Sequence, residues 1–328
     1  MNLRDSKRLV IAGASSLLGA ELKSLLEESL LADWEFRLVD EEAASGTLTE
    51  AGGEAAVIQP VEEDSFDKSR FVFFTGSQQF TRTNLAFASR SGATVVDLSG
   101  ASAGNAASTG WLPKREAPSV PKSSLFFIPS AAGEGITRLA LALRGLDSAG
   151  LTAVCFQPVS EAGKSGVEEL ESQTGQLLSF QSVGKPVFDA QVAFNLLDRF
   201  GAQSLHRLSN AANRIRREVS GCIGGNEPVA LQLLHAPVFY GTVFAAFAKL
   251  PAAVTSEALV GACKGLDFAT CSAEDAPSNV SAAGETAIQL APPQPDASVT
   301  GGWWFWGAAD NIRLPAWNAV KLAEKLLG

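Results

Sequence analysis

The stretch RLVIAGASSLLG (residues 8–19) decides the fold of the amino-terminal part of the chain. Residues 8–12 form a short apolar run of β-strand length, which ends at Gly13. After Gly19, four leucines follow at helical spacing: Leu22, Leu25, Leu26 and Leu30. Residues 21–31 are therefore predicted to form a helix. A glycine-containing turn between a strand and a helix is typical of the first βα junction of a doubly wound sheet.

The pattern of alternating strands and helices continues after this junction. Strands are predicted at residues 35–39, 71–75, 93–98 and 125–128, with a helix at 84–91. Such alternation indicates an α/β fold, a Rossmann-type doubly wound parallel sheet with right-handed crossovers. We assign residues 1–133 and a closing helix within 308–328 to this domain.

Residues 134–307 show a different pattern, typical of a second, α+β domain. Helices are predicted at residues 136–143, 166–180 and 205–219. Strands are predicted at residues 151–159, 230–234, 238–247, 287–289 and 303–306. The proline-rich segment 291–298 is expected to be a surface loop. A length of 328 residues is consistent with two domains.

The glycine turn predicts a dinucleotide site. Backbone N–H groups and a helix N-terminus at such a turn can bind a pyrophosphate. The string GASSLLG differs from the usual GxGxxG, because Ser16 stands where the middle glycine would be, and it also fits a structural turn without a ligand. Asp40 ends the second predicted strand, where a carboxylate can accept hydrogen bonds from the ribose hydroxyls of NAD. With Glu41 and Glu42 it would repel the 2′-phosphate of NADP, so NAD(H) is favoured over NADP(H). The same acidic residues also fit a solvated loop.

Charge and cysteine usage exclude several classes of function. The chain has 26 Lys and Arg against 35 Asp and Glu, a net charge of −9 without a basic run, so we expect no nucleic-acid or anionic-membrane partner. The only histidines are His206 and His235. Four cysteines without CxxC spacing predict reduced thiols, a cytoplasmic location and no metal site.

The amino-terminus allows a second interpretation. Arg4, Lys7 and Arg8 ahead of residues 9–20 resemble a secretory signal. We expect a strand instead, because an amphipathic helix pattern follows. No segment has about 18 consecutive apolar residues, so no membrane span is expected.

Several strings along nearly the whole chain resemble the aspartate-β-semialdehyde dehydrogenase family. They are GASSLLG (13–19), DLS (97–99), FQPVSEAG (156–163), FDAQVAFNLL (188–197), PVFYG (237–241) and DNIR (310–313). The resemblance implies a second domain that forms a homodimer. It also implies an NADP-dependent reaction between an acyl phosphate and an aldehyde. In that reaction a Cys thiolate is the nucleophile and a His is the acid/base.

The catalytic positions of that family carry other residues here. Gly133 stands at the nucleophile position, Thr242 at the acid/base position and His235 at the substrate-binding Arg position. The phosphate-binding Arg position falls at Ala103. A Glu/Lys pair of the family corresponds to Ser204 and Arg207. The substrate-positioning Gln157 is retained. Glu161 replaces a glycine near the expected nicotinamide, where it could crowd or repel a ligand. The predicted cofactor-binding residues are Gly13, Ser15, Ser16, Leu17, Leu18, Gly19, Asp40, Ser99, Ser160, Gly163 and Asn311.

Substitutes for the missing groups are conceivable. Cys155 shares a strand face with Gln157 and is either a nucleophile or a buried apolar side chain. Ser130 or Thr242 would need His235 as a partner base. His235 itself is either functional or a core histidine, and Glu134 is interpreted as compensating a helix dipole.

Two hypotheses follow from these residues. The first is a catalytically degenerate, Usg-like member of the family that keeps the dimer and either keeps a dinucleotide pocket or binds no dinucleotide. Simultaneous loss of nucleophile, acid/base and anion-binding Arg removes a mechanism whose residues act as a unit. The alternative is an active oxidoreductase with thiol-independent hydride transfer to an aldehyde or acyl substrate. It is favoured by the glycine turn, Asp40 and Gln157.

Overall fold

The computed structural model describes residues 6–51, 53–113, 125–224 and 229–328. Contacts between Cα atoms divide the chain into two compact units. Unit 1 comprises residues 1–130 and 315–328, and unit 2 comprises residues 131–314. Arg4 lies outside the described residues.

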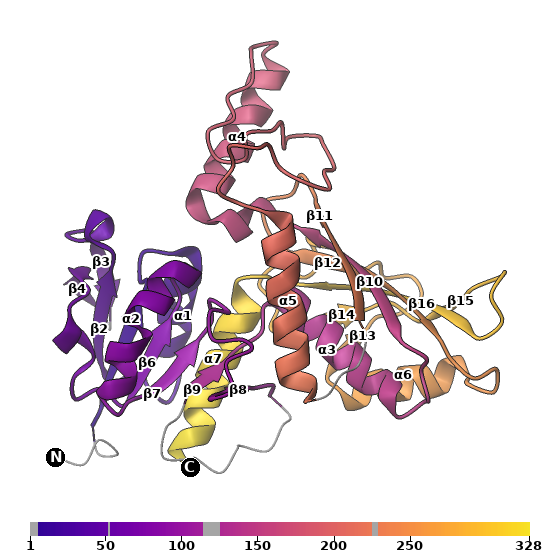
Figure 1. Cartoon of the computed structure of the whole chain (residues 1–328), viewed down its shortest axis with the longest axis horizontal. Coiled ribbons are helices and arrows are strands. Elements are labelled where there is room, and N and C mark those ends of the chain that lie inside the picture. The colour runs from indigo at the N-terminus through magenta and orange to yellow at the C-terminus, as the bar shows by residue number, and fades with distance from the viewer. Residues whose placement is uncertain (1–5, 52, 114–124, 225–228) are drawn as a thin grey trace. The chain divides into compact units, whose positions relative to one another are not determined.

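Unit 1 is built on a parallel seven-stranded sheet of order β5-β2-β1-β6-β7-β9-β8. Figure 1 labels β2, β6, β7, β8 and β9 of this sheet. Its strands are β1 (Arg8–Ala12), β2 (Glu35–Asp40), β5 (Gln59–Pro60), β6 (Phe71–Phe74), β7 (Thr94–Asp97), β8 (Ser108–Gly110) and β9 (Leu125–Phe127). A separate hairpin pairs β3 (Leu48–Ala51) with β4 (Glu54–Val57). The predicted doubly wound parallel sheet is confirmed.

Both faces of this sheet are covered, which explains why its strands are nearly continuous apolar runs. In β1, Leu9 and Ile11 pack with α1 (Leu17–Glu27) and α7 (Arg313–Leu327). Val10 and Ala12 pack on the opposite face with α2 (Gln78–Arg90). Helix α1 begins and ends four residues earlier than predicted. Ser16 caps its N-terminus, and Leu30 is exposed beyond its end.

Unit 2 is built on a mixed sheet of order β11-β10-β12-β16-β14-β13, with β15 paired to β16. Its strands are β10 (Leu151–Gln157), β11 (Val229–His235), β12 (Thr242–Lys249), β13 (Phe268–Thr270), β14 (Ile288–Leu290), β15 (Gln294–Pro295) and β16 (Gly302–Ala309). Strands β10 and β11 are parallel, whereas β12 is antiparallel to β10 and β16 is antiparallel to β12.

Helices cover one face of this second sheet. A large apolar core joins the sheet to α3 (Ala131–Arg144), α5 (Leu208–Ile223) and α6 (Ser256–Gly265). Helix α4 (Gly163–Leu178) projects from this unit, as Figure 1 shows. The predicted mixture of helices and strands is confirmed, although α6 and β13 were not predicted and the short strand β15 lies within segment 291–298, which was expected to be a loop. In the described residues, no helix is both long and apolar enough to cross a bilayer.

Candidate functional site

The glycine turn of unit 1 is formed by a very close approach of two backbones. Gly13 has a φ of +94°, and a Cβ there would lie 2.2 Å from the backbone nitrogen of Gly76 in the turn after β6. A Cβ on Gly19 would lie 2.5 Å from the carbonyl oxygen of Gly13. Both glycines are therefore required by packing within the protein, whether or not a ligand binds.

Ser16 does not block this turn. Its hydroxyl donates to the carbonyl of Thr75 (3.0 Å) and accepts from the N–H of Gly19 (2.9 Å), so it is directed into the protein as the N-cap of α1. Leu17 and Leu18 open the helix, and helix geometry leaves their N–H groups without an intrahelical carbonyl. A helix N-terminus with such N–H groups fits a pyrophosphate.

Asp40 is hydrogen-bonded to the same glycine turn. It is 6% exposed. One carboxylate oxygen accepts from the N–H of Ser15 (2.8 Å), and the other accepts from the N–H of Glu41 (2.8 Å). A carboxylate has about four acceptor positions, so these bonds leave acceptor capacity for ribose hydroxyls. The carboxylate thus both orders the turn and places a negative charge beside it.

Replacing Gly13 with Ala is expected to destabilise unit 1 by about 2–3 kcal/mol, because the methyl group meets backbone atoms at a positive φ. Urea denaturation followed by tryptophan fluorescence measures the loss. Gly46→Ala is the matched control, because Gly46 also has a positive φ (+79°) but no atom lies within 4 Å of its added Cβ. Equal losses in the two variants would show that the close approach to Gly76 has no energetic role.

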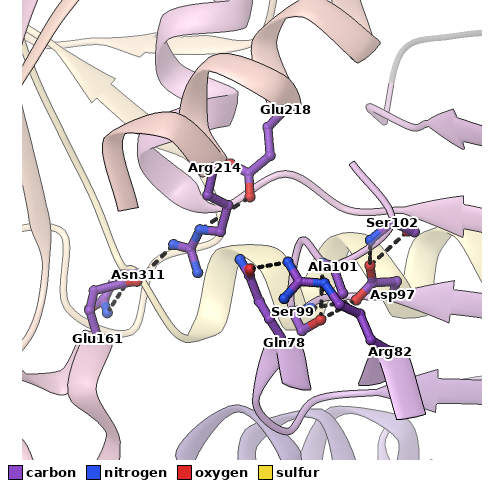
Figure 2. Close-up of polar contacts among 10 residues, drawn as sticks. All are labelled: Gln78, Arg82, Asp97, Ser99, Ala101, Ser102, Glu161, Arg214, Glu218 and Asn311. Carbon is purple, nitrogen blue, oxygen red and sulfur yellow. Dashed lines mark hydrogen bonds and ion pairs between the residues drawn. The ribbon is translucent and has the colours of Figure 1, made fainter. Parts of the chain in front are cut away.

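Two further turns, after β6 and β7, lie at the same carboxyl edge of the unit 1 sheet as the glycine turn. Ser77 caps α2 by accepting from the N–H of Phe80 (3.0 Å), which gives a second helix N-terminus beside Gly13. This turn was not predicted, although the apolar run followed by Thr-Gly-Ser (75–77) is a sequence signal for it. The carboxylate of Asp97 accepts from the backbone N–H and the hydroxyl of both Ser99 and Ser102 (Figure 2). The hydroxyl of Ser99 is thus already engaged within the loop.

In unit 2, three of the predicted site positions lie side by side. Gln157 ends β10 and pairs with His235 at the end of β11. On its other side Phe156 pairs with Val243, so the next position brings Gln157 opposite Thr242. Alternation puts Gln157, His235 and Thr242 on the face that α3 and α5 cover. The structure therefore brings together these positions, which are far apart in the sequence.

Gly133 lies in the first turn of α3, and its carbonyl accepts from the hydroxyl of Thr137 (2.6 Å). The same turn approaches β12, since a Cβ on Gly135 would lie 2.8 Å from the ring of Phe244. Glu134 lies in the first turn of α3, where an acidic residue can compensate the helix dipole, but it also has a partner that was not predicted. Its side chain is fully buried and ion-paired with Arg138, whose guanidinium also donates to the carbonyls of Leu266 and Asp267 (3.1 Å each).

His235 is a core histidine. It is 1% exposed, and its ring lies 5.6 Å from that of Phe200 and 6.2 Å from that of Phe188. Its Nε2 lies 3.1 Å from the carbonyl oxygen of Val192. A carbonyl only accepts, so Nε2 carries the proton in this contact. Burial lowers the pKa of His235 below 6.5, while the bond to Val192 opposes this shift. The imidazole is therefore neutral at pH 7.

This lowered pKa predicts a loss of stability in mild acid. Below pH 6.5 the unfolded chain takes up a proton on this residue before the folded chain does, so stability present above pH 6.5 falls as the pH drops through that value. The slope is at most about 1.4 kcal/mol per pH unit. His235→Gln should show a shallower fall between pH 7.5 and 5.5 in urea denaturation. An unchanged slope would contradict the assignment, and His206→Gln reports the effect of the other histidine.

The thiols of this chain are poorly suited to nucleophilic attack. Cys155 is fully buried, and burial raises the pKa of its thiol to about 12, so the thiol stays protonated at pH 7. Burial also raises the pKa of Cys263 to about 12. Cys222 is buried in the last turn of α5, shortly before β11 begins. Gln157 pairs with His235 at the other end of β11. Cys271 follows β13 at the far edge of the sheet.

Glu161 is not an unpaired charge that would simply repel a ligand. Its carboxylate pairs with the guanidinium of Arg214 (2.9 Å) and accepts from the side-chain amide of Asn311 (3.2 Å), as Figure 2 shows. Asn311 also donates to the hydroxyl of Ser160 (3.1 Å) and accepts from the N–H of Gly241 (2.8 Å). Ser160 and Asn311 are therefore engaged with each other. Arg214 was not predicted as a site residue, because only its place in the predicted helix 205–219 was visible in the sequence.

Four further positions singled out in the sequence, at residues 103, 163, 204 and 207, also lie in unit 1 or unit 2 with defined environments. Gly163 has a φ of +75°, and nothing lies within 4 Å of an added Cβ. Ala103 is buried. Ser204 donates to the carbonyl of Val187 (2.8 Å), and Arg207 donates to the carbonyl of Ala202 (2.8 Å). In the described residues, no group of three His, Cys, Asp or Glu side chains is placed to hold a metal ion.

Comparison with known proteins identifies the family. Residues 8–114 match the model of the NAD binding domain of semialdehyde dehydrogenase, and residues 140–314 match that of its dimerisation domain. The chain belongs to the semialdehyde dehydrogenase family. A USG-1 protein homolog of Azotobacter vinelandii is 29% identical, covering 97% of each chain. An aspartate-semialdehyde dehydrogenase of Rickettsia bellii is 24% identical, also covering 97% of each chain.

Solved structures of the semialdehyde dehydrogenase family share this fold. A probable aspartate-semialdehyde dehydrogenase of Pseudomonas aeruginosa superposes with a TM-score of 0.86 at 25% identity, covering 98% of this chain and 99% of the other. Aspartate semialdehyde dehydrogenase II of Vibrio cholerae superposes with a TM-score of 0.87 at 22% identity. The predicted family resemblance is thereby confirmed.

Proposed function

We propose that this chain is a catalytically degenerate member of its family, which keeps a dimeric scaffold and a dinucleotide pocket. The observation that carries the proposal is the composition of the predicted catalytic positions. Gly133 has no side chain, Thr242 has a hydroxyl without acid/base capacity near neutral pH, and His235 is buried against Val192. The buried, protonated thiol of Cys155 supplies no replacement nucleophile.

A matched pair of titrations tests the dinucleotide part of this proposal. NAD(H) and NADP(H) are titrated separately into the protein, with quenching of the six tryptophans as the signal. NAD(H) is favoured because the carboxylate of Asp40 can accept from ribose hydroxyls but repels a 2′-phosphate. Asp40→Asn should weaken NAD(H) and narrow the difference between the two cofactors. Stronger binding of NADP(H) to the unaltered chain would overturn this preference.

The alternative function is a thiol-independent oxidoreductase that transfers a hydride directly to an aldehyde or acyl substrate. The intact glycine turn, Asp40 and Gln157 favour it. The titrations separate the two functions. If neither cofactor binds, the alternative fails, the dinucleotide part of the first proposal fails with it, and a scaffold or interaction protein remains. If a cofactor binds and an aldehyde is oxidised or reduced, the degenerate function fails.

We also propose that unit 2 forms a homodimer through the sheet face opposite α3, α5 and α6. Strand β16 leaves Trp304 and Trp306 46% and 41% exposed on that face. Their rings contact Phe247 and Phe156, at centroid distances of 5.0 and 6.3 Å. We call these four residues the aromatic patch. A sheet face that presents several aromatic rings favours association.

Hydrogen bonds hold both indoles of the aromatic patch in place. Trp304 donates to the carboxylate of Asp296 (2.8 Å), and Trp306 donates to the carbonyl of Pro277 (2.7 Å). The bond from Trp304, together with donors from Ser298, lowers the pKa of Asp296 to about 2, so this acceptor stays ionised. Rings fixed in this way lose little side-chain entropy on association. The matched dimerisation-domain model, residues 140–314, includes the whole patch.

A further inference from the structure

The carboxylate of Glu161 is bound by Arg214 in the way that a protein binds a carboxylate ligand. The two side chains come from different elements, the 3₁₀ turn at Val159–Ala162 and the middle of α5. Their exposed fractions are only 15% and 19%. The carboxylate of Glu161 receives a charged donor from Arg214 and a neutral amide donor from Asn311. A guanidinium combined with an amide is a donor set that recognises a free carboxylate.

The donors are fixed independently of Glu161. The guanidinium of Arg214 also lies 3.4 Å from the carboxylate of Glu218, one helical turn further along α5 and 1% exposed. The amide oxygen of Asn311 accepts from the N–H of Gly241 (2.8 Å), and its amide nitrogen also donates to the hydroxyl of Ser160 (3.1 Å), so two contacts besides Glu161 hold this side chain. Removing the Glu161 carboxylate would therefore leave Arg214 and Asn311 close to their present positions, as a preorganised site.

Glu161 lies close to a glycine that has open space around it. Gly163, two residues later, has a φ of +75° and open space around it, where the 3₁₀ turn joins α4. A glycine has more backbone conformations open to it than other residues, while the N–H groups of Val159 and Ser160 are bonded to the carbonyls of Val238 and Phe239.

We propose that Arg214 and Asn311 form a binding site for a small carboxylate, which Glu161 occupies from within the chain. A carboxylate on the same chain competes at an effective concentration of millimolar or higher, so free carboxylates at low concentration are excluded while Glu161 stays in place. A ligand that enters must displace it. The inference does not depend on dinucleotide binding or on the absence of turnover.

Chemical rescue tests this site on the full-length protein. The melting temperatures of wild type and Glu161→Ala are measured in 50 mM sodium acetate and in sodium chloride of equal ionic strength. Glu161→Ala is expected to melt about 5 °C below wild type in chloride, because Arg214 and Asn311 lose a shared acceptor. Acetate should raise the melting temperature of Glu161→Ala by about 3 °C relative to chloride, while wild type changes by less than 1 °C.

The double variant Glu161→Ala/Arg214→Met decides whether acetate acts at this site. It should show no difference between acetate and chloride. An acetate effect that persists in the double variant, or that is absent from Glu161→Ala, would overturn the proposal. Should Glu161→Ala fail to fold in chloride, its refolding yield in acetate is the readout, and the absence of any recovery has the same meaning. Glu168→Ala on α4 is the control for removal of one negative charge from the same region.

Discussion

A Trp304→Ser/Trp306→Ser double variant is expected to run as a monomer in size-exclusion chromatography with light scattering, whereas the wild type runs as a dimer. Central aromatic residues of an interface contribute roughly 2 kcal/mol or more each, and a two-fold axis counts each substitution twice. The dissociation constant should therefore rise by at least about 10³-fold, even if the contributions are far from additive. The patch is on the solvent side of the sheet, so far-ultraviolet circular dichroism should be unchanged.

The control for the double variant is Leu48→Ser, which removes a 75%-exposed apolar side chain from the β3–β4 hairpin of unit 1. It should leave the dimer intact. A double variant that remains dimeric would show that the aromatic patch is not the interface. Loss of dimer in both variants would point to a general effect of surface hydrophobicity.

Replacing Arg138 with Met is expected to cost about 3–5 kcal/mol of unfolding free energy, because it leaves the carboxylate of Glu134 buried without its cation. The bonds from Arg138 to the carbonyls of Leu266 and Asp267 are lost as well. Urea denaturation measures the cost. The double variant Glu134→Gln/Arg138→Met should recover much of it, since no charge is then buried. A single variant as stable as the wild type would show that Glu134 does not depend on this pair.

The fold could be predicted because its signals are local. The parallel sheet of unit 1 followed from apolar runs separated by helical spacing, and β1 begins and ends at the predicted residues. Helix ends were predicted less well, since they depend on caps. Ser16 starts α1 four residues earlier than the leucine pattern suggested.

The site was harder to predict because its contacts are long-range. Alternation correctly placed Cys155 and Gln157 on one face, but the sheet pairing that puts His235 and Thr242 beside Gln157 is not visible in any short string. Glu134 and Glu161 were interpreted without their partners. Arg138 is one turn away in the same helix, but Arg214 is 53 residues from Glu161. A charge counted on its own in a sequence gives no indication of whether the fold neutralises it.

The central claim is that the family's thiol chemistry is lost, and turnover tests it most directly. Purified protein is incubated with L-aspartate β-semialdehyde, phosphate and either NAD⁺ or NADP⁺, and reduced cofactor is followed at its absorbance maximum. Without a nucleophile or an acid/base, the rate should equal that of a protein-free control with each cofactor. Phosphate-dependent formation of NADH or NADPH that is lost in Gln157→Ala would contradict the claim, because it would place an active site at the position where the structure shows Gln157 between His235 and Thr242.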